Sequence, residues 1–409
     1  MRILFVGLSQ SVHLARWINQ LDGTSWERFL FPVETEPPHA DLRNITYFNN
    51  SPLPGHRTNR NLRYRHWTSF YYAIEYLIGF QRRFKSSMPL ERRMPISYRT
   101  RALAHAIKQT KPDIIHSLEI QHAGYITLNA KHLLGESFPK WIVTNWGSDI
   151  YLFGRLSAHR ERICEILGNC DFYSCECERD IRLARDLGLR GQPLPVFPNA
   201  GGFDLAQCEA LRQPGPISQR RNIMLKGYQG WAGRALSGLR ALERCADLLR
   251  AGNYQLTIYS ANNPEVPIAA ELFEQNTGIK VNVIAAEVTH EEMLRRYGKS
   301  RLYIGLSISD AISTSLLEAM VMGAFPIQSC TACADEWITD RQSGLIVPPE
   351  DVEVIETAIR RALTDDTLVD QAAELNWETA QKRLSSTIIK PQVVSFYERV
   401  YNSIQEKST

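Results

Sequence analysis

Two acidic residues at a fixed spacing are the strongest candidates for chemistry in this chain. Asp310 and Glu318 are separated by seven residues within GLSISDAISTSLLEAMVMGAFPIQ, residues 305–328. The apolar run 302–306 is expected to be a strand that ends in a polar loop, and the loop opens into a helix that stops at Gly323. The unpaired N–H groups of a helix start attract anions such as phosphate. Carboxylates repel phosphate, so their expected partners are hydroxyl groups. Phosphate and hydroxyl binding side by side describe a sugar-nucleotide site.

The elements that must position these residues follow an alternating pattern. Strand-length apolar runs alternate with segments of helical periodicity, which indicates parallel sheets with helices on both faces. Strands are expected at residues 2–6, 113–116, 141–144, 172–175, 195–197, 222–225, 255–259 and 281–284, and helices at 12–21, 235–249, 268–275 and 290–297. Because the pattern restarts after a Gly- and Pro-rich stretch, we predict an α/β protein with two Rossmann-like, doubly wound parallel-sheet domains facing a cleft.

Length and ligand-binding rules refine this organisation. A chain of 409 residues exceeds what one hydrophobic core usually supports. We therefore predict an N-terminal domain over residues 1–205 and a C-terminal domain over residues 206–385. Ligands of doubly wound sheets bind outside the carboxyl ends of the strands, so the loops at those ends are where site residues are expected.

Composition limits the partners and the compartment. A formal net charge of +3 is too small to indicate nucleic acid as a partner. There is no signal sequence after Met1 and no apolar stretch of about 18 residues, so we expect a cytoplasmic protein. The eight cysteines lack zinc-site spacing and are expected to be reduced thiols. No metal and no cofactor is predicted.

The chain resembles the retaining glycosyltransferases of family 4, which have the two-domain GT-B fold. DAISTSLLEAMVMGAFPIQS and the following EWITDRQSGLIVPPED are similar to that family's acidic pair, helix and late Gly–Pro segment. MRILFVGLSQSVHLARWINQL, KPDIIHSLEIQHAG, VTNWGSDIY and PNAGG resemble its N-terminal segments. The resemblance implies a retaining, metal-independent, hexosyltransferase-like enzyme that uses a nucleotide-diphosphate sugar. It also implies that a final helix within residues 386–409 crosses back to the first domain.

The resemblance assigns the acidic pair and the serine-rich loop to the donor. Glu318 is expected to accept hydrogen bonds from the ribose hydroxyls. Asp310, where the family usually has Glu, is expected to bind hydroxyls of the donor sugar. Ser313, Thr314 and Ser315 are suited to phosphate or sugar. Ordinary structural roles explain the same residues: acidic groups complement a helix dipole, and Ser315 with Glu318 would form a capping box.

Further donor contacts are expected on other loops. Lys226 and Arg234 lie where the family places cations that neutralise the leaving diphosphate, although here their order is reversed. Glu287 falls in the region of the family's nucleobase pocket. Gly7 and Ser9 follow the first strand and are expected to approach the donor. The candidates for direct catalytic roles are Asp149, Asp310, Lys226 and Arg234.

Acceptor-side candidates lie in the N-terminal half. His13 and Trp17 share one face of the first helix, where a packed Trp17 explains the pattern as well as a functional one does. Trp146 stands where many family members have a histidine that contacts the donor sugar. Asp149 and His122 are therefore the candidates for sugar or acceptor contacts, with a structural role equally open.

A basic and aromatic segment suggests a further partner. Residues 57–101 hold eleven Lys or Arg against two acidic residues, interleaved with aromatic side chains. This pattern fits anionic lipid headgroups or a lipid-diphosphate acceptor at the inner face of a membrane. A packed helix at residues 69–80 with solvated arginines at its ends explains it equally well. The surrounding fold argues against single-stranded nucleic acid.

The predicted function is transfer of a sugar from a nucleotide-sugar donor to a sugar, lipid-linked or other hydroxyl acceptor. Bacterial-type polysaccharide or glycolipid synthesis is the expected process. Two alternatives are open at this point. One is a sugar-nucleotide epimerase or hydrolase on the same fold, and the other is a non-catalytic protein that binds nucleotide sugars or lipids.

Overall fold

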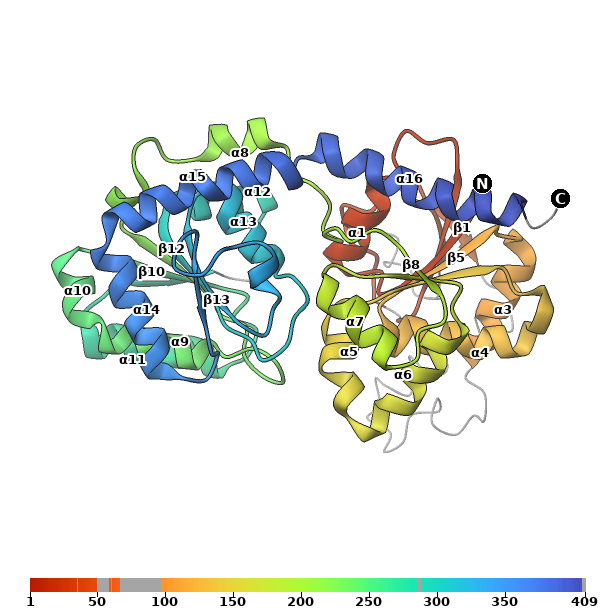
Figure 1. The fold of residues 1–409 in the computed structure, drawn as a ribbon, viewed down its shortest axis with the longest axis horizontal. Coiled ribbons are helices and arrows are strands. Elements are labelled where there is room, and N and C mark those ends of the chain that lie inside the picture. Colours follow the sequence, from red (N-terminus) through yellow and green to blue (C-terminus); the bar gives the residue numbers. More distant parts are fainter. Residues whose placement is uncertain (35, 50–58, 60, 67–97, 285–287, 407–409) are drawn as a thin grey trace. The chain divides into compact units, whose positions relative to one another are not determined.

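The computed structural model describes residues 1–34, 36–49, 59, 61–66, 98–284 and 288–406. The chain forms two compact units, and each is a parallel sheet with helices on both faces (Figure 1). The N-terminal unit comprises Met1–Gly201 and Lys390–Thr409, and the C-terminal unit comprises Gly202–Ile389. The prediction of two Rossmann-like α/β domains is confirmed.

The strands described in the N-terminal unit are parallel throughout, in the order β4-β3-β2-β1-β5-β6-β7-β8. They are β1 (Arg2–Gly7), β2 (Glu27–Pro32), β3 (Thr46–Asn49), β4 (Arg63–His66), β5 (Ile114–Leu118), β6 (Lys140–Thr144), β7 (Phe172–Ser174) and β8 (Gln192–Pro193). The helices are α1 (Val12–Asn19), α3 (Tyr98–Thr110), the π-helix η2 (Ile120–Gly124), α4 (Tyr125–Leu134), η3 (Gly135–Ser137), α5 (Ser148–Tyr151), η4 (Phe153–Arg155), α6 (Ser157–Asn169), α7 (Glu178–Asp186) and α16 (Ser386–Gln405).

Continuous apolar strands explain why this sheet is covered on both faces. Leu4 and Val6 of β1 pack in the cluster formed with α3, α4, α6 and α7. Phe5, between them, points to the other face, where its ring lies 6.1 Å from that of Tyr397 on α16. Trp17 of α1 is buried on this second face and stacks on Phe197, so Trp17 is a core residue.

The C-terminal unit has the strand order β11-β10-β9-β12-β13-β14, again parallel. Its strands are β9 (Asn222–Lys226), β10 (Gln255–Tyr259), β11 (Val281–Val283), β12 (Ser300–Gly305), β13 (Phe325–Ser329) and β14 (Leu345–Val347). Its helices are α8 (Leu205–Leu211), η5 (Ile217–Gln219), α9 (Ala235–Arg244), α10 (Ala246–Ala251), α11 (Glu265–Thr277), α12 (His290–Gly298), α13 (Thr314–Met322), η6 (Ala334–Glu336), α14 (Val352–Thr364) and α15 (Asp366–Arg383). The sequence order reverses direction around β9, which creates a switch point between β9 and β12.

Two predicted elements are wrong in detail. Residues 195–197 form no strand, and the edge strand β8 lies earlier, because Pro195 has no N–H to donate to a sheet. The helix predicted over residues 235–249 is divided at Cys245. The Cys245 N–H bonds to the Leu242 carbonyl, three residues back, which ends α9 before α10 begins.

A buried hydrogen-bond chain fixes α16 in the core of the N-terminal unit. The Trp17 indole donates to the Tyr397 hydroxyl at 2.7 Å, and this hydroxyl lies 2.6 Å from Nδ1 of His116. An indole can only donate, so Tyr397 accepts from Trp17, and Nε2 of His116 lies 2.5 Å from the Thr144 hydroxyl. Burial lowers the pKa of His116 to about 3, so the ring is neutral.

Replacing Tyr397 by phenylalanine is expected to lower the free energy of unfolding by about 1–3 kcal/mol, because two buried polar atoms lose their partner. The urea-unfolding midpoint of the full chain measures this change. Tyr401→Phe, one turn further along α16, is the matched control and should leave the midpoint where it is. Equal midpoints for the two variants would show that the chain of hydrogen bonds adds no stability.

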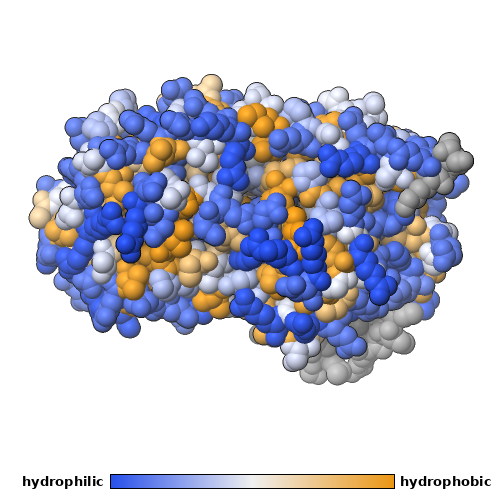
Figure 2. Space-filling model, viewed as in Figure 1, coloured by the Kyte–Doolittle hydropathy of each residue, from blue (hydrophilic) through white to orange (hydrophobic). Residues whose placement is uncertain are grey.

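Among the described residues, no helix is both long and apolar enough to cross a bilayer. Figure 2 shows hydrophilic residues over most of the viewed surface, with smaller hydrophobic areas between them. The predicted helix at 69–80 and most of the basic aromatic segment 57–101 lie outside the described residues.

Candidate functional site

Two loops at the switch point of the C-terminal unit form one continuous surface. The loop after β9 ends at Arg234, whose N–H donates to the Leu306 carbonyl at 3.0 Å. Ile308, in the loop after β12, donates to the Ala232 carbonyl at 2.8 Å. These bonds hold the residues that follow the two strands side by side at the carboxyl edge. This edge is where ligands of doubly wound sheets bind.

Lys226, Asp310 and Ser313 meet at this edge. The Lys226 ammonium lies 3.9 Å from Oδ2 of Asp310 and 3.3 Å from the Ser313 hydroxyl. Both charged side chains keep part of their surface open, 22% for Lys226 and 29% for Asp310. The other Asp310 oxygen accepts the Ala311 N–H at 2.9 Å, which fixes the carboxylate. A cation and a hydroxyl-accepting carboxylate are therefore neighbours at the start of α13.

The start of α13 corrects one expectation and supports another. The helix begins at Thr314, and Ser313 is its N-cap residue, so Ser315 already lies in the first turn. The predicted capping box of Ser315 with Glu318 is therefore wrong. The Ser313 side chain does not cap the helix either, and it contacts Lys226 and the Tyr303 hydroxyl instead. The helix ends at Gly323 in the left-handed conformation, with φ of 83°, as the sequence predicts.

Arg234 lies on the same pair of loops, but its side chain is held by its own surroundings. Its Nε donates to Glu350 at 2.7 Å, and its Nη1 donates to the carbonyls of Gly230 and Gly233. Glu350 follows β14 and was not predicted as a site residue. An exposed acidic residue in a loop carries no sequence signal for such a contact.

Glu318 lies in a buried polar pocket on α13. Only 7% of the residue is exposed, and Oε1 is 2.8 Å from Nε2 of His290 on α12. Tyr259 and Tyr297 lie near Glu318. Burial raises the pKa of each phenol, and the negative charge of Glu318 raises it further. Their buried hydroxyls also interact with Ser315 and with each other. Sequence reasoning missed His290, although it stands directly after the helix-capping Thr289. Glu287 lies outside the described residues.

In the N-terminal unit, Gly7 and Ser9 are occupied by the fold. A Cβ on Gly7 would lie 2.4 Å from Cδ1 of Leu14, so a larger residue there would require the Leu14 side chain to shift where α1 packs on β1. Ser9 is fully buried, and its hydroxyl lies 3.3 Å from that of Tyr47. The donor role of these two residues stays a prediction.

The other predicted residues of this unit gather at the carboxyl ends of β5 and β6. The rings of His13 and Trp146 meet edge to face, 6.0 Å apart. Asp149 is 6% exposed and accepts the N–H groups of Trp146 and Ile120 at 2.9 and 3.2 Å. His122 is paired with a further carboxylate, Glu119, at 3.2 Å.

Glu119 is a second residue that sequence reasoning missed. It is buried, and its backbone has φ of 80° and ψ of 159°, a region that residues other than glycine rarely adopt. Its carboxylate accepts the N–H groups that open η2 and its hydrogen bond raises the pKa of His122. Burial, and then the charge of Glu119, raise the pKa of Asp149 to about 8. Perturbed carboxyl groups of this kind are frequent at functional sites.

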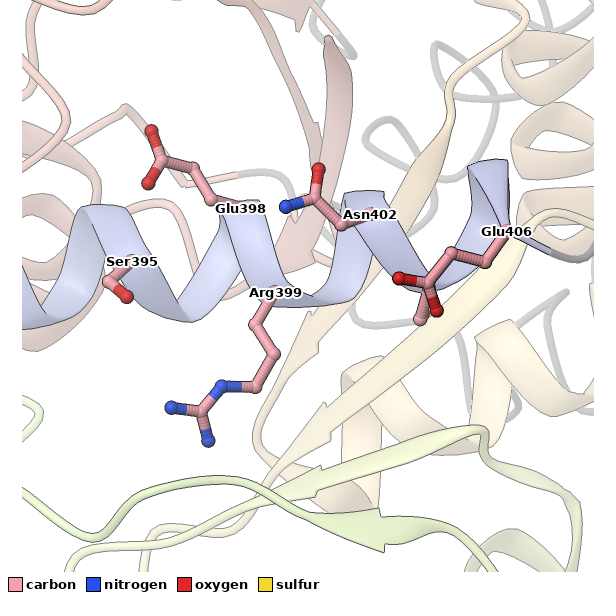
Figure 3. Close-up of a pocket in the computed structure, with 6 residues that line it drawn as sticks. Ser395, Glu398, Arg399, Asn402 and Glu406 are labelled. Atoms are coloured by element: carbon pink, nitrogen blue, oxygen red, sulfur yellow. The ribbon is translucent and has the colours of Figure 1, made fainter.

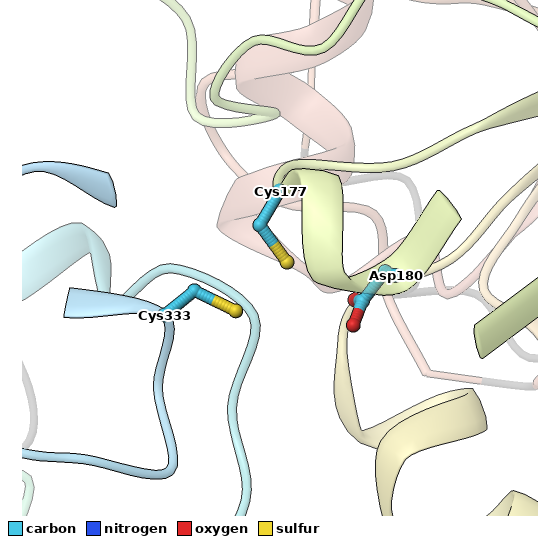
Figure 4. Close-up of side chains that lie close together, drawn as sticks. All are labelled: Cys177, Asp180 and Cys333. Atoms are coloured by element: carbon cyan, nitrogen blue, oxygen red, sulfur yellow. The ribbon is translucent and has the colours of Figure 1, made fainter. Parts of the chain in front are cut away.

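The segment that carries Asp149 is anchored from the next helix along the sheet. Asn145, fully buried, donates to the Asp180 carboxylate at 2.7 Å. Asp180 and Cys177 lie together where α7 begins (Figure 4). Through its hydrogen bond with Asn145, Asp180 supports the loop after β6 from within the fold. All eight cysteines of the chain are free thiols, and most are buried.

Asp149→Asn is expected to change the pH dependence of stability. The folded pKa of about 8 exceeds the ordinary 3.8, so between these values the folded state holds a proton that the unfolded chain releases. The free energy of unfolding contributed by Asp149 therefore falls as pH rises through this range. Asparagine keeps an oxygen for both N–H groups but cannot ionise, so the variant should gain stability relative to wild type at pH 8. Urea unfolding at several pH values measures this, and parallel pH profiles would refute it.

Two surface hollows of the N-terminal unit contain none of the predicted residues. One, of about 400 Å³, runs along α16 (Figure 3) and is lined by Ser395, Glu398, Arg399, Asn402, Ser403 and Glu406. The other, of about 550 Å³, is lined by Lys131, His132, Gly135, Glu136, Phe138, Lys140 and Asp171. Lys140 begins β6, so the second hollow lies at the amino end of the sheet, where ligands of such folds do not bind.

The two units together have the architecture of the GT-B fold. Solved structures with this fold include the sucrose-phosphate synthase of Thermosynechococcus elongatus, with 16% identity, a TM-score of 0.68 and coverage of 98% of this chain and 100% of that one. Anabaena HepE in complex with UDP and glucose has 12% identity, a TM-score of 0.66 and coverage of 97% and 99%. The lipopolysaccharide outer core galactosyltransferase WaaB has 14% identity, a TM-score of 0.63 and coverage of 98% and 99%.

Family models match both halves of the chain. The model for glycosyl transferases group 1 matches residues 240–380, and the model for glycosyl transferase 4-like proteins matches residues 81–170. No curated protein sequence gives a significant match. The chain belongs to the group 1 glycosyltransferases with the GT-B fold, and it is an enzyme that transfers a sugar.

Proposed function

We propose that this glycosyltransferase moves a sugar from a nucleotide-diphosphate sugar to an acceptor hydroxyl with retention of anomeric configuration. The proposal is carried by the contacts of Lys226 with Asp310 and Ser313 at the switch point of the C-terminal unit. Glu318 is the fifth residue of the adjoining helix α13. A cation, a helix start and two carboxylates match a diphosphate next to two groups of hydroxyls.

In the proposed mechanism, charge stabilisation and positioning replace covalent catalysis. Lys226 and the first N–H groups of α13 stabilise the diphosphate as it gains charge on departure. The departing diphosphate accepts the proton of the incoming hydroxyl on the same face of the sugar. Asp310 orients the sugar through its hydroxyls. Arg234 joins the cations when its contacts with Glu350 and the loop carbonyls are exchanged for phosphate.

Binding measurements with different nucleotides are needed to identify the base and the sugar of the donor. HepE, which has this fold, binds UDP and glucose. UDP-sugars are therefore the first donors to test, beside GDP-, ADP- and TDP-sugars. Thermal-shift measurements with each nucleotide identify the base. We propose that no metal is needed, so activity in EDTA should equal activity with Mg²⁺.

The acceptor is proposed to be a sugar or a lipid-linked sugar bound by residues of the N-terminal unit, among them His13, His122, Trp146 and Asp149. The name of WaaB supports a glycolipid acceptor, and that of the sucrose-phosphate synthase supports a soluble one, so both kinds belong in the assay. By sequence, residues 57–101 support contact with the inner face of an anionic membrane. Co-flotation with anionic and neutral vesicles tests this contact.

The deciding experiment follows the anomeric proton of the product by NMR. An α-linked donor should give an α-linked product if the mechanism retains configuration, and a β-linked product would refute retention. Turnover of the donor without an acceptor would favour an epimerase or hydrolase. Nucleotide binding with no turnover of any donor and acceptor pair would favour a binding protein.

A further inference from the structure

We propose that His290 is the positioning residue for Glu318 and that it determines how tightly the enzyme holds the ribose of its donor. This inference rests on the proposed role of Glu318 as the acceptor of ribose hydroxyl hydrogen bonds. It adds a residue from a different helix, α12, to the donor site.

The pairing is direct and lies at the edge of the pocket. Nε2 of His290 and Oε1 of Glu318 are 2.8 Å apart. The Glu318 side chain is 9% exposed, whereas that of His290 is 39% exposed, so the histidine lies on the solvent side of the pair. On its other side, the His290 ring lies 6.5 Å from the ring of Phe203. The imidazole is thus packed against a buried aromatic ring while it holds the carboxylate.

The position of His290 is itself fixed by the start of α12. The Thr289 hydroxyl accepts the Glu292 N–H at 3.2 Å and caps the helix, and His290 is the first helical residue. A capped helix start restricts the direction in which the side chain of His290 leaves the backbone. The carboxylate is therefore aimed by a rigid element rather than by a mobile loop.

The surroundings of Glu318 explain why such a partner matters. The hydroxyls of Tyr259 and Tyr297 are buried close to Glu318, so a rotated carboxylate would find other donors inside the pocket. A hydrogen bond to one carboxylate oxygen favours a single rotamer. Binding sites lose affinity when such supporting contacts are removed.

The test compares three variants, namely His290→Ala, His290→Gln and Thr289→Ala. Alanine removes the hydrogen bond, and glutamine keeps a donor of similar reach. Thr289→Ala loosens the start of α12 without removing the contact, so it reports how much the helix start alone contributes to the positioning. Each variant is titrated by calorimetry with UDP, GDP and ADP and with the 2′-deoxy form of each.

For the nucleotide that wild type binds, His290→Ala should raise Kd about tenfold, and the glutamine variant should recover most of the affinity. Thr289→Ala should lose less affinity than His290→Ala, because it keeps the imidazole and its hydrogen bond. The loss in His290→Ala should shrink for the 2′-deoxy nucleotide, because one of the hydroxyls served by Glu318 is absent. A merely structural effect of the histidine would weaken both nucleotides equally.

The outcomes separate this inference from the proposed function. Wild type that binds neither these three nucleotides nor TDP overturns both. Wild-type binding that Glu318→Ala weakens but His290→Ala does not would overturn only the role of His290. Equal losses for ribose and deoxyribose nucleotides, or equal losses in His290→Ala and Thr289→Ala, would also overturn it.

Discussion

Glu318→Ala is expected to weaken binding of the cognate nucleoside diphosphate by about ten- to a hundredfold, which corresponds to roughly 1–3 kcal/mol. The physical reason is the loss of a buried carboxylate that would accept two ribose hydroxyls. Solvent does not readily offset this loss, because the Glu318 side chain is 91% buried. Calorimetric titration measures the change.

Two companion variants make this result interpretable. Glu318→Gln keeps the shape of the side chain but lacks the charge, so it should show an intermediate loss. Glu291→Ala removes a carboxylate on α12 whose side chain is 45% exposed. This variant should bind like wild type. The melting temperature of each variant reports whether His290, left without its partner, disturbs the fold. A folded Glu318→Ala variant with wild-type affinity would remove Glu318 from the donor site.

The sequence was sufficient for the general fold because the signals were local and repeated. Continuous apolar runs mark strands buried on both faces, and the switch from β to α periodicity recurs along both units. The strand β12, the helix α13 and its stop at Gly323 were predicted closely. Glycine adopts the left-handed backbone conformation at position 323 without the strain that a residue with a side chain would have. The strand predicted at residues 195–197 was wrong. The residues there are apolar, but Pro195 lacks the N–H group that a strand donates to its neighbour in a sheet.

The candidate site was predictable only where its residues belong to one local motif. Asp310, Ser313 and Glu318 share a strand–loop–helix, so their spacing carries the information. The partners His290 and Glu350 come from other elements, and their contacts depend on tertiary packing, which no spacing encodes. Ser315 shows the reverse case, because a capping-box pattern was present but the helix begins at Thr314.

Residues of the N-terminal unit illustrate a third limit. Gly7 and Ser9 have the types expected of a ligand loop, yet side-chain packing and burial use them internally. Glu119, in contrast, gave no signal, since its left-handed backbone and its buried contact with His122 arise only in the folded chain. Residue type alone therefore does not distinguish a side chain that binds a ligand from one that supports the fold.

Lys226→Ala is expected to reduce kcat by about a hundredfold or more, with a smaller effect on the affinity for the donor. The reason lies in when the charge develops. The diphosphate gains negative charge as the glycosidic bond breaks, so a cation beside it stabilises the transition state more than the bound donor. Lys226 is placed for this by its contacts with Ser313, at 3.3 Å, and Asp310, at 3.9 Å. Steady-state kinetics with the identified donor separate kcat from KM.

Neighbouring charges make the same prediction more specific. Lys226→Arg keeps the positive charge and should restore part of kcat, whereas Lys226→Met keeps the length without the charge and should not. Lys299→Ala, an exposed lysine at the far end of α12, is the control for a general loss of charge in the same unit. Because Lys226 also lies beside Asp310, its removal takes away a cation that offsets this carboxylate next to the diphosphate. The loss in Lys226→Ala should therefore be smaller when Asp310 is replaced by asparagine as well. Additive losses in the double variant would show that the two residues act separately.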